Sequence, residues 1–442
     1  MKYKFSKFLI TAKKESDIYV YSTLTTSIIK IPSEIFNNLY LHNRYNDYPE
    51  IVEKLKHMGI LISLDFDENL YLADIRKKSM QELNNVGTPY YLITPTMDCN
   101  ARCYYCFEHG SHHEKMSLET ANNVIAFINK NAPDKDIIIQ WFGGEPLLAI
   151  DIIEYISKQL SDLGFSIKSK VTTNGYLLTP DVISTAINNW GTDVIQITLD
   201  GLNDDYNRVK NYIGSAHDNA FNIVINNIQH VLDSGIKMRI RINYNPLNLN
   251  PAKEIIAFLY DRFGKYSNLY VYFAPIDSKV IPSITNTFEE LKEHPLITML
   301  DFKKGFAGMA QSNRGITDQH ELILNKYYLH PISLSCTGVC NRNITIDSLG
   351  DIYVCHRLLG KGKEYSSGDV VNGLINNNIR LYYQSTDLPD EKCEHCNLLP
   401  LCQGGCKFRR INYSAEKSCL TVKGAVTQLL LRAIEEMKTI ND

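Results

Sequence analysis

Hydrophobic residues in the middle of the chain form short continuous runs that alternate with longer stretches of helical spacing. The short runs predict buried strands, and the longer stretches predict helices. The strands are expected at residues 89–94, 137–142, 169–173, 194–199, 238–244 and 269–273, and the helices at 117–131, 151–163, 180–189, 221–234 and 251–263. Strands that alternate with helices indicate a parallel sheet with right-handed crossovers, so we expect an α/β fold, a partial (β/α)6 barrel. Functional residues should then lie at the carboxyl ends of the strands.

The N-terminal region, 1–85, has a different pattern, which predicts a small winged-helix-like domain. We expect strands at 5–11, 18–24 and 60–63 and helices at 34–40 and 49–58. Ser33 is expected to cap the first helix, because its hydroxyl group can accept from a free backbone N–H. The polar stretch 73–86 predicts a linker helix.

The pattern changes again after the barrel, which is expected to span residues 86–275. A polar bridge is predicted at 276–335, and it is followed by a cysteine-rich domain at 336–442. An amphipathic helix at 423–438 is expected to close this domain. The chain therefore divides into four predicted parts.

Composition limits the classes of protein. The chain has 442 residues, 44% hydrophobic and 21% charged, which is typical of a soluble globular protein. A net charge of −3 gives no reason to expect a nucleic-acid partner. The N-terminus has no apolar signal-peptide region, and no apolar stretch approaches the roughly 18 residues of a membrane span. We therefore expect a cytoplasmic protein without a membrane partner, in which eleven cysteines are ligands rather than disulfides.

Three cysteines follow the first barrel strand with the spacing Cys-x3-Cys-x2-Cys. They are Cys99, Cys103 and Cys106, and an aromatic residue, Tyr105, precedes the last. Three thiolates do not complete a structural zinc site, which usually has four protein ligands, but they suit a 4Fe–4S cluster with one open iron. Buried or redox-inert cysteines are the alternative. The motif resembles the signature of the radical SAM family. In that family the open iron binds S-adenosylmethionine (SAM), and reductive cleavage gives a 5′-deoxyadenosyl radical that abstracts a substrate hydrogen.

The resemblance extends to the second strand end, where Gly143, Gly144, Glu145 and Pro146 follow one another. Glycines let a backbone approach its neighbours closely, and a carboxylate can accept from an ammonium group. The resemblance implies that Glu145 and the backbone of the two glycines hold the amino group of SAM. On its own, such a motif would usually be a turn.

The next strand ends provide further candidates for SAM binding by the same resemblance. Asn174 is expected to contact the ribose hydroxyls or the carboxylate, and Thr198 and Asp200 the ribose or the substrate. An Asn-Gly or Asp-Gly turn without a ligand is the alternative at each place. On the fifth strand we expect Asn243 to point into the barrel. Tyr105 should face the adenine, with backbone groups of Phe107 beside it.

Eight cysteines lie between positions 336 and 419, in an arrangement that resembles the SPASM extension of radical SAM enzymes. That extension binds two auxiliary 4Fe–4S clusters, so the resemblance implies three clusters in all. Auxiliary cluster I would be held by Cys336, Cys340, Cys355 and Cys406, and auxiliary cluster II by Cys393, Cys396, Cys402 and Cys419. A pair of zinc sites is the alternative, since Cys-x2-Cys recurs in zinc ribbons.

SPASM enzymes mostly modify peptides or proteins. Anaerobic sulfatase maturases have an Asp as general base directly after the cysteine that corresponds to Cys355, whereas this chain has His356 and then Arg357. The catalytic candidates are therefore His356, Arg357 and Asp200. The N-terminal domain resembles the precursor-peptide recognition domain of peptide-modifying radical SAM enzymes.

These resemblances predict an enzyme that modifies a ribosomally made precursor peptide, leader plus core, by a thioether or carbon–carbon crosslink. A reductant such as flavodoxin or ferredoxin would supply electrons. Sulfatase-maturase-like oxidation of Cys or Ser, and peptide epimerisation, are alternative activities. An iron–sulfur electron carrier is the non-enzyme alternative. The substrate peptide, the bond type and the oligomeric state are left open.

Overall fold

The computed structural model describes most of the chain. The described residues are 3–85, 87–108, 110–214, 219–244, 249–276, 323–324, 327, 329, 336–387, 390–413, 419 and 426–441. The predicted bridge at 276–335 therefore lies almost entirely outside the described residues. Within the described part, no helix has the length and apolar character needed to span a membrane.

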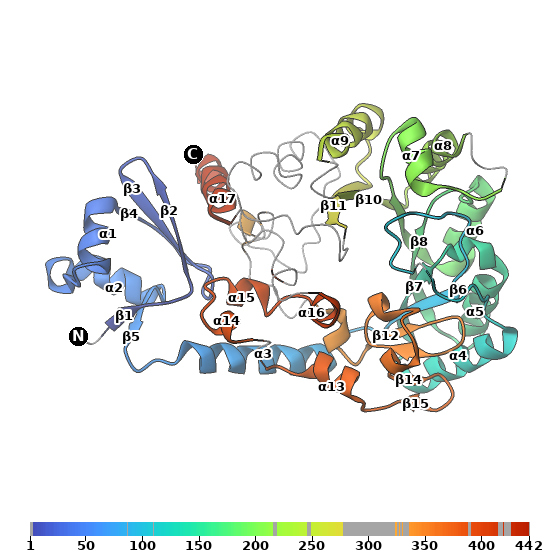
Figure 1. The fold of residues 1–442 in the computed structure, drawn as a ribbon, viewed down its shortest axis with the longest axis horizontal. Coiled ribbons are helices and arrows are strands. Elements are labelled where there is room, and N and C mark those ends of the chain that lie inside the picture. Colours follow the sequence, from blue (N-terminus) through green and yellow to red (C-terminus); the bar gives the residue numbers. More distant parts are fainter. Residues whose placement is uncertain are drawn as a thin grey trace.

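A mostly parallel sheet forms the centre of the molecule and confirms the predicted α/β class (Figure 1). Its six parallel strands in chain order are β6 (Tyr90–Thr96), β7 (Asp136–Gly143), β8 (Ser166–Thr173), β9 (Thr192–Thr198), β10 (Lys237–Tyr244) and β11 (Leu269–Pro275). The helices between them are α4 (Leu118–Asn131), α5 (Ile150–Asp162), α6 (Pro180–Trp190), α7 (Asn203–Lys210), α8 (Ala220–Asp233) and α9 (Leu249–Phe263), with the 3-10 turn η2 (Pro146–Ala149) before α5. The predicted strands and helices are confirmed, whereas α7 was not predicted.

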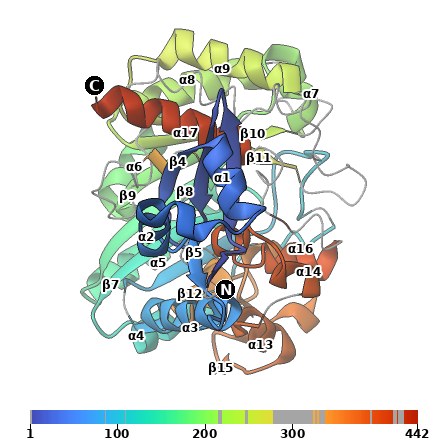
Figure 2. The ribbon, with the colours of Figure 1, turned by 90° about the vertical axis from the view of Figure 1, so that its left-hand side faces the viewer.

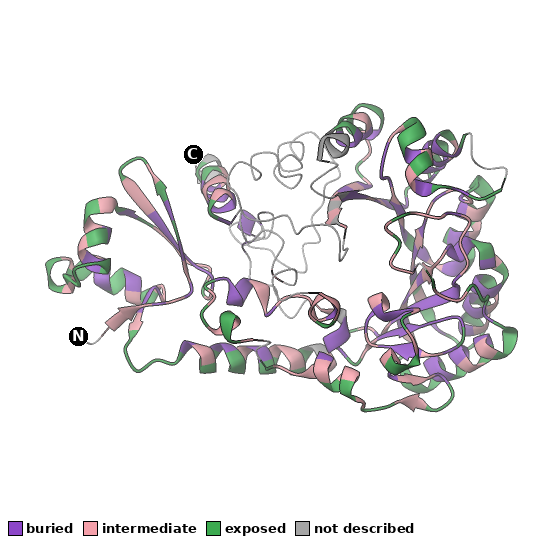
Figure 3. Ribbon diagram, in the orientation of Figure 1, coloured by how far each residue is buried: buried purple, intermediate pink, exposed green. Residues whose placement is uncertain are grey.

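Burial explains why these segments form the sheet. In β7 the alternate side chains of Ile137, Ile139 and Trp141 are completely buried, as expected for a strand covered by helices. The buried surface follows the strands and the inner faces of their helices (Figure 3). Ser117 caps α4, because its Oγ accepts from the backbone N–H of Thr120 at 3.0 Å.

The C-terminal region adds strands to this sheet. β12 (Asn343–Ile346) pairs in parallel with β6, and β13 (Ile352–Tyr353) pairs antiparallel with β12, so the sheet has eight strands. Neither strand was predicted. Because β12 and β13 lie between Cys340 and Cys355 in the chain, their position brings this segment next to β6.

The N-terminal unit (residues 3–63) has two small antiparallel sheets and two helices. The strands are β1 (Tyr3–Phe5), β2 (Leu9–Lys14), β3 (Asp17–Ser22), β4 (Ile28–Pro32) and β5 (Leu61–Ser63), and the helical segments are α1 (Ser33–Tyr40), η1 (Tyr45–Asp47) and α2 (Pro49–His57). β1 pairs with β5, and β2, β3 and β4 form a three-stranded sheet. The predicted strand at 5–11 is therefore two strands, and β4 was missed. The winged-helix-like classification remains a prediction.

The predicted cap at Ser33 is wrong. Pro32 is the N-cap residue of α1, and Ser33 is already inside the helix. The reason is that β4 continues up to the helix: Pro32 pairs with Asp17, and the N–H of Ser33 donates to the carbonyl oxygen of Ser16 at 2.9 Å. The chain thus passes from sheet to helix without a capping turn.

The long helix α3 (Glu68–Asn85) connects the N-terminal unit to the central sheet and confirms the predicted linker helix. The C-terminal elements are η3 (Thr337–Val339), η4 (His356–Leu358), η5 (Lys363–Tyr365), β14 (Gly368–Asp369), β15 (Gly373–Leu374), α13 (Asn378–Gln384), α14 (Glu391–Glu394), α15 (Leu399–Cys402), α16 (Lys407–Asn412) and α17 (Val426–Asn441). α17 confirms the predicted last helix and lies beside β2, where Lys14 Nζ is 2.7 Å from Glu435 Oε1 (Figures 1 and 2).

Candidate cofactor and substrate site

A cavity of about 920 Å³ opens at the carboxyl ends of the parallel strands. We call it the strand-end cavity. Its lining includes predicted site residues from four neighbouring strand ends: Gly143, Gly144, Asn174, Thr198 and Asn243. The expectation that functional residues gather at this edge of the sheet agrees with their observed positions.

Two groups of cysteines line the same cavity. Cys99, Cys103 and Cys106 belong to the loop after β6, residues 97–106, which we call the cysteine loop. The second group comes from the C-terminal region and consists of Cys336, Cys355 and Cys406. A molecule in the cavity would therefore lie within reach of both groups.

The cysteine loop is held against the Gly-Gly turn. The N–H of Glu145 donates to the carbonyl oxygen of Asp98 at 2.7 Å, and that of Gly144 donates to Thr96 at 3.3 Å. A Cβ atom on Gly144 would overlap the carbonyl oxygen of Asp98, and Gly143 has a φ of 113°, which favours glycine. The two glycines are thus needed for the close approach of the cysteine loop.

Glu145 lies behind the cavity wall and is fully buried. Its carboxylate accepts from Thr173 Oγ1 at 2.7 Å, from the N–H of Asn174 at 2.7 Å and from the N–H of Leu147 at 3.1 Å. Burial raises the pKa of Glu145 to about 7, against the opposing effect of these hydrogen bonds. Glu145 therefore braces the end of β8, and its predicted contact with SAM remains a prediction.

Asn174 connects β8 to the cysteine loop. Its Nδ2 donates to Asn100 Oδ1 at 2.6 Å, and its carbonyl oxygen lies 3.4 Å from the hydroxyl oxygen of Tyr206. The side chain also lines the strand-end cavity. Its position suits the predicted contact with a ligand, and the same residue fixes the loop that bears the cysteines.

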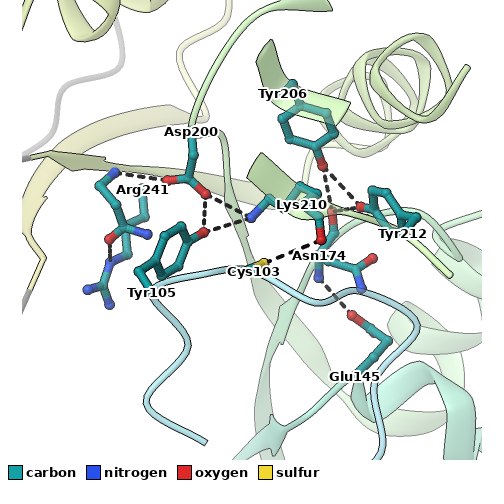
Figure 4. A network of polar contacts seen from close by, with 10 residues as sticks. Cys103, Tyr105, Glu145, Asn174, Asp200, Tyr206, Lys210, Tyr212 and Arg241 are labelled. Atoms are coloured by element: carbon teal, nitrogen blue, oxygen red, sulfur yellow. Dashed lines mark hydrogen bonds and ion pairs between the residues drawn. The ribbon is translucent and has the colours of Figure 1, made fainter. Parts of the chain in front are cut away.

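Asp200, Lys210 and Tyr105 form a polar network at the end of β9 (Figure 4). Lys210 Nζ lies 2.8 Å from Asp200 Oδ2 and 3.2 Å from the hydroxyl of Tyr105, which itself donates to Asp200. Burial alone would lower the pKa of Lys210, but Asp200, together with Tyr105, Cys103 and Tyr206, outweighs it and holds that pKa well above the usual value. Lys210 also accepts from the N–H of Arg102 through its carbonyl oxygen at 2.9 Å.

Asn243 and Arg241 both line the cavity from β10, two residues apart, while Ile242 between them is completely buried. Asn243 lines the cavity together with Arg241, and its contact with SAM remains a prediction. Arg241 Nε donates to Asn243 Oδ1 at 2.8 Å, and the N–H of Asn243 donates to Asp200 Oδ1 at 3.1 Å. β10 is thereby tied to the end of β9.

His356 stands between two aromatic rings of the cavity lining. Its ring centroid lies 5.5 Å from that of Phe142 and 6.2 Å from that of Phe107, both edge to face. Burial lowers the pKa of His356 to about 4, with further contributions from Arg357 and Arg241. The Arg357 guanidinium lies 5.3 Å from the centre of the Phe107 ring.

The structure brings together three cysteines of one predicted set, and the division into two ligand sets remains a prediction. Cys336, Cys355 and Cys406 share one apolar cluster, and burial raises the pKa of Cys355 to about 12. Cys340, the fourth predicted ligand of that set, is buried. In the other set Cys393 and Cys402 are close enough to interact electrostatically. Cys396 and Cys419 are partly buried.

The donor sets consist of sulfur and suit iron–sulfur clusters. Among the residues that the structure describes, no three His, Cys, Asp or Glu side chains gather closely enough to hold one metal ion. In a 4Fe–4S cluster each thiolate binds a different iron atom, so the ligands of a cluster need not gather as those of a single ion do.

Sequence reasoning missed three charged residues of the site. Lys210 ends the unpredicted helix α7, and Arg241 was not chosen over Asn243. Glu108 lines the cavity, burial raises its pKa to about 7, and its Oε1 has no hydrogen-bond partner among the described residues. A local signal existed only for Arg241, whose spacing of two from Asn243 places both on one face of a strand.

Comparisons with known proteins agree with this geometry. Residues 93–259 match the model of the radical SAM superfamily. The cysteine-type anaerobic sulfatase-maturating enzyme of Clostridium novyi (strain NT) is 27% identical over 72% of this chain and 87% of that enzyme. The radical SAM cyclopropyl synthase TigE of Paramaledivibacter caminithermalis is 22% identical over 98% of this chain and 96% of the synthase.

A solved structure shows the same fold over nearly the whole chain. It is Streptococcus suis SuiB bound to precursor peptide SuiA, with a TM-score of 0.51 and 16% identity. The superposition covers 96% of this chain and 99% of SuiB. The likeness therefore includes the region before the matched superfamily model as well as the region after it.

Proposed function

We propose that this chain, which contains a radical SAM domain, is an enzyme that modifies a ribosomally made precursor peptide by installing a thioether or carbon–carbon crosslink. One observation supports the proposal above others. The strand-end cavity is lined both by the cysteine loop and by Cys336, Cys355 and Cys406. A peptide side chain in this cavity would lie between two iron–sulfur clusters.

A radical SAM domain implies one 4Fe–4S cluster and SAM. Cys99, Cys103 and Cys106 would hold the cluster. Side chains at the ends of β8, β9 and β10, namely Asn174, Thr198 and Asn243, would position SAM from the cavity wall. When bound, the cluster and SAM would supply a 5′-deoxyadenosyl radical that removes a hydrogen atom from the substrate.

The chain itself positions the substrate and manages its protons. His356 faces the cavity between Phe107 and Phe142, where an imidazole can accept a proton from a substrate group. Arg357, beside it, supplies a positive charge. Cys336, Cys340, Cys355 and Cys406 would hold auxiliary cluster I next to that position, and the remaining four cysteines auxiliary cluster II.

The N-terminal unit is proposed to bind the leader of the precursor peptide. The likeness to SuiB, whose structure contains a precursor peptide, supports a peptide substrate. In the three-stranded sheet β4 is an edge strand, while the opposite edge strand, β2, lies beside α17. A leader peptide would add to the edge of β4 by main-chain hydrogen bonds.

Anaerobic incubation with SAM, a reductant and candidate peptides tests the activity. A precursor peptide that is a substrate is expected to lose two hydrogens for each crosslink, with release of 5′-deoxyadenosine. A sulfatase peptide with an active-site Cys or Ser is the second substrate, because a sulfatase-maturating relative is 27% identical. Oxidation of that peptide, with the precursor peptide unchanged, would contradict the proposal.

Hydrogen exchange tests the leader site separately. Added leader peptide is expected to slow amide exchange in β4 but not in β2. Equal exchange in β4 with and without a leader that binds would refute strand addition at this edge. This measurement uses the leader alone, so its result does not depend on whether the core peptide is modified.

A further inference from the structure

One face of α3 is buried along its first three turns. Glu68, Leu72 and Arg76 follow at intervals of four residues and are 6%, 2% and 3% exposed. Residues four apart lie on one face of a helix, so these side chains form a single row. α3 passes from the N-terminal unit toward the central sheet alongside the C-terminal elements (Figure 1).

The first two residues of this row attach the helix to its neighbours. Glu68 accepts from the hydroxyl of Ser6 and, at 3.1 Å, from the backbone N–H of Lys7. Leu72 packs with Phe8 and Leu399 in a small apolar cluster, with Cys393 at its edge. The N-terminal unit, α3 and the segment 393–402, which bears three of the predicted ligands of auxiliary cluster II, thus meet in one apolar cluster.

Arg76 comes one turn later, on the helix face on which Leu72 packs beside Cys393. Its Nε has no hydrogen-bond partner among the described residues, although the side chain is buried. Burial lowers the pKa of Arg76, and nearby Cys393, Asp387 and Cys402 oppose this shift, in that order. A buried guanidinium nitrogen without a hydrogen-bond partner is costly, so further negative charge close to Nε would stabilise it.

A second arginine approaches the same cysteines from α16. Arg410 Nη2 lies 3.3 Å from Cys393 Sγ, and Arg410 Nη1 lies 2.6 Å from Asp390 Oδ2. Two guanidinium groups from distant parts of the chain therefore converge on one thiol-rich region. Arg410 already pairs with Asp390, whereas four thiolates on a 4Fe–4S cluster would add the negative charge that the unpaired Nε of Arg76 lacks.

We propose that Arg76 is a charge partner of auxiliary cluster II, positioned on α3 by the N-terminal unit and acting together with Arg410. The inference rests on the cluster assignment of the proposed function. Reduction makes the cluster more negative, and a buried positive charge stabilises the reduced form, so Arg76 raises the reduction potential. The N-terminal unit is thereby part of the wall of the cluster site as well as a candidate leader site.

The test compares Arg76→Gln with Lys77→Gln, an exposed neighbour on the same helix. Both are made in the full chain with Cys99, Cys103 and Cys106 replaced by Ala, which leaves the two auxiliary clusters. Redox titration followed by electron paramagnetic resonance is expected to show two steps. Arg76→Gln should move one step to a more negative potential and leave the other unchanged, whereas Lys77→Gln should change neither.

If Arg76→Gln prevents assembly of one cluster, iron analysis should show the loss of that cluster's iron, and Arg76→Lys should restore iron because it restores the charge. Normal iron content with two unchanged potentials would overturn the inference. Loss of iron that Arg76→Lys does not restore would also overturn the inference, because cluster assembly would then depend on the shape of the Arg76 side chain and not on its charge. Neither measurement uses a peptide, so failure of the peptide-modifying function would be seen independently.

Discussion

The ammonium nitrogen of Lys210 lies 2.8 Å from Oδ2 of Asp200, and both side chains are 3% exposed. Asp200 follows β9, whereas Lys210 ends α7. The hydroxyl of Tyr105 joins both groups (Figure 4). Because Tyr105 belongs to the cysteine loop, this buried ion pair fixes that loop to the edge of the sheet.

Lys210→Met is therefore expected to destabilise the protein. Removing one partner of a buried ion pair leaves the other charge unpaired, which costs about 3 kcal/mol or more. The thermal midpoint of the anaerobically purified variant should fall by several degrees, and less iron should be retained by the cysteine loop. The double variant Lys210→Met/Asp200→Asn should lose less than the sum of the two single variants.

Arg208→Met is the matched control, because Arg208 lies on the same helix and pairs with Asp205 at 2.6 Å on the surface. Exposed pairs contribute about 0–1 kcal/mol, so this variant should be close to the parent protein. Equal effects of the two substitutions would mean that the Lys210–Asp200 pair has no special part in holding the loop.

The sequence was sufficient for the central parallel sheet but not for this ion pair. Apolar runs separated by helical stretches predicted six parallel strands, and parallel strands bring their carboxyl ends to one edge, so Gly143, Asn174, Thr198 and Asn243 could be grouped in advance. Lys210 could not, since a single lysine in a polar segment usually lies in water.

Contacts between distant segments explain the other omissions. β12 is short and pairs with β6, so Asn343 lies opposite Tyr90, which is far away along the chain, and no local pattern specifies that partner. Arg76 has the same difficulty, since Cys393 and Cys402 belong to the opposite end of the sequence. The cap at Ser33 failed because the strand before it was not recognised.

Gly144→Ala is expected to impair the cysteine loop. The added Cβ would overlap the carbonyl oxygen of Asp98, which accepts from the N–H of Glu145 at 2.7 Å. The cysteine loop must move, so the variant should lose iron from the cluster that this loop is proposed to hold and should release less 5′-deoxyadenosine. Iron analysis and chromatography of the SAM products measure both effects.

A glycine in open space provides the control for this variant. Gly164 follows α5 with a φ of 84°, and a Cβ atom added there would have no neighbour within 4 Å among the described residues. Asn tolerates this conformation, so Gly164→Asn should keep its iron. Full iron content in Gly144→Ala would show that the loop does not depend on the close approach.

Cys336→Ala tests the ligand set of auxiliary cluster I. Cys336 shares an apolar cluster with Cys355 and Cys406, and all three line the strand-end cavity. Loss of a thiolate should change the electron paramagnetic resonance spectrum of one cluster or remove its iron, while the other clusters stay intact. An unchanged spectrum with full iron would mean that Cys336 is not a ligand.

Glu145 should make stability depend on pH. Burial raises its pKa from 4.5 to about 7, so in this range the folded protein binds more protons than the unfolded chain. The contribution of Glu145 to stability is therefore complete below about pH 4.5 and declines as the pH rises, by about 3 kcal/mol once the pH exceeds 7. Thermal midpoints of the parent and of Glu145→Gln, measured at several pH values from 5 to 8, should draw closer together or cross in favour of Gln as the pH rises. Glu119→Gln, an exposed carboxyl on α4, controls for the loss of one surface charge. A constant difference between the parent and Glu145→Gln across this range would show that Glu145 is already ionised in the folded protein, and that its hydrogen bonds to Thr173, Asn174 and Leu147 outweigh its burial.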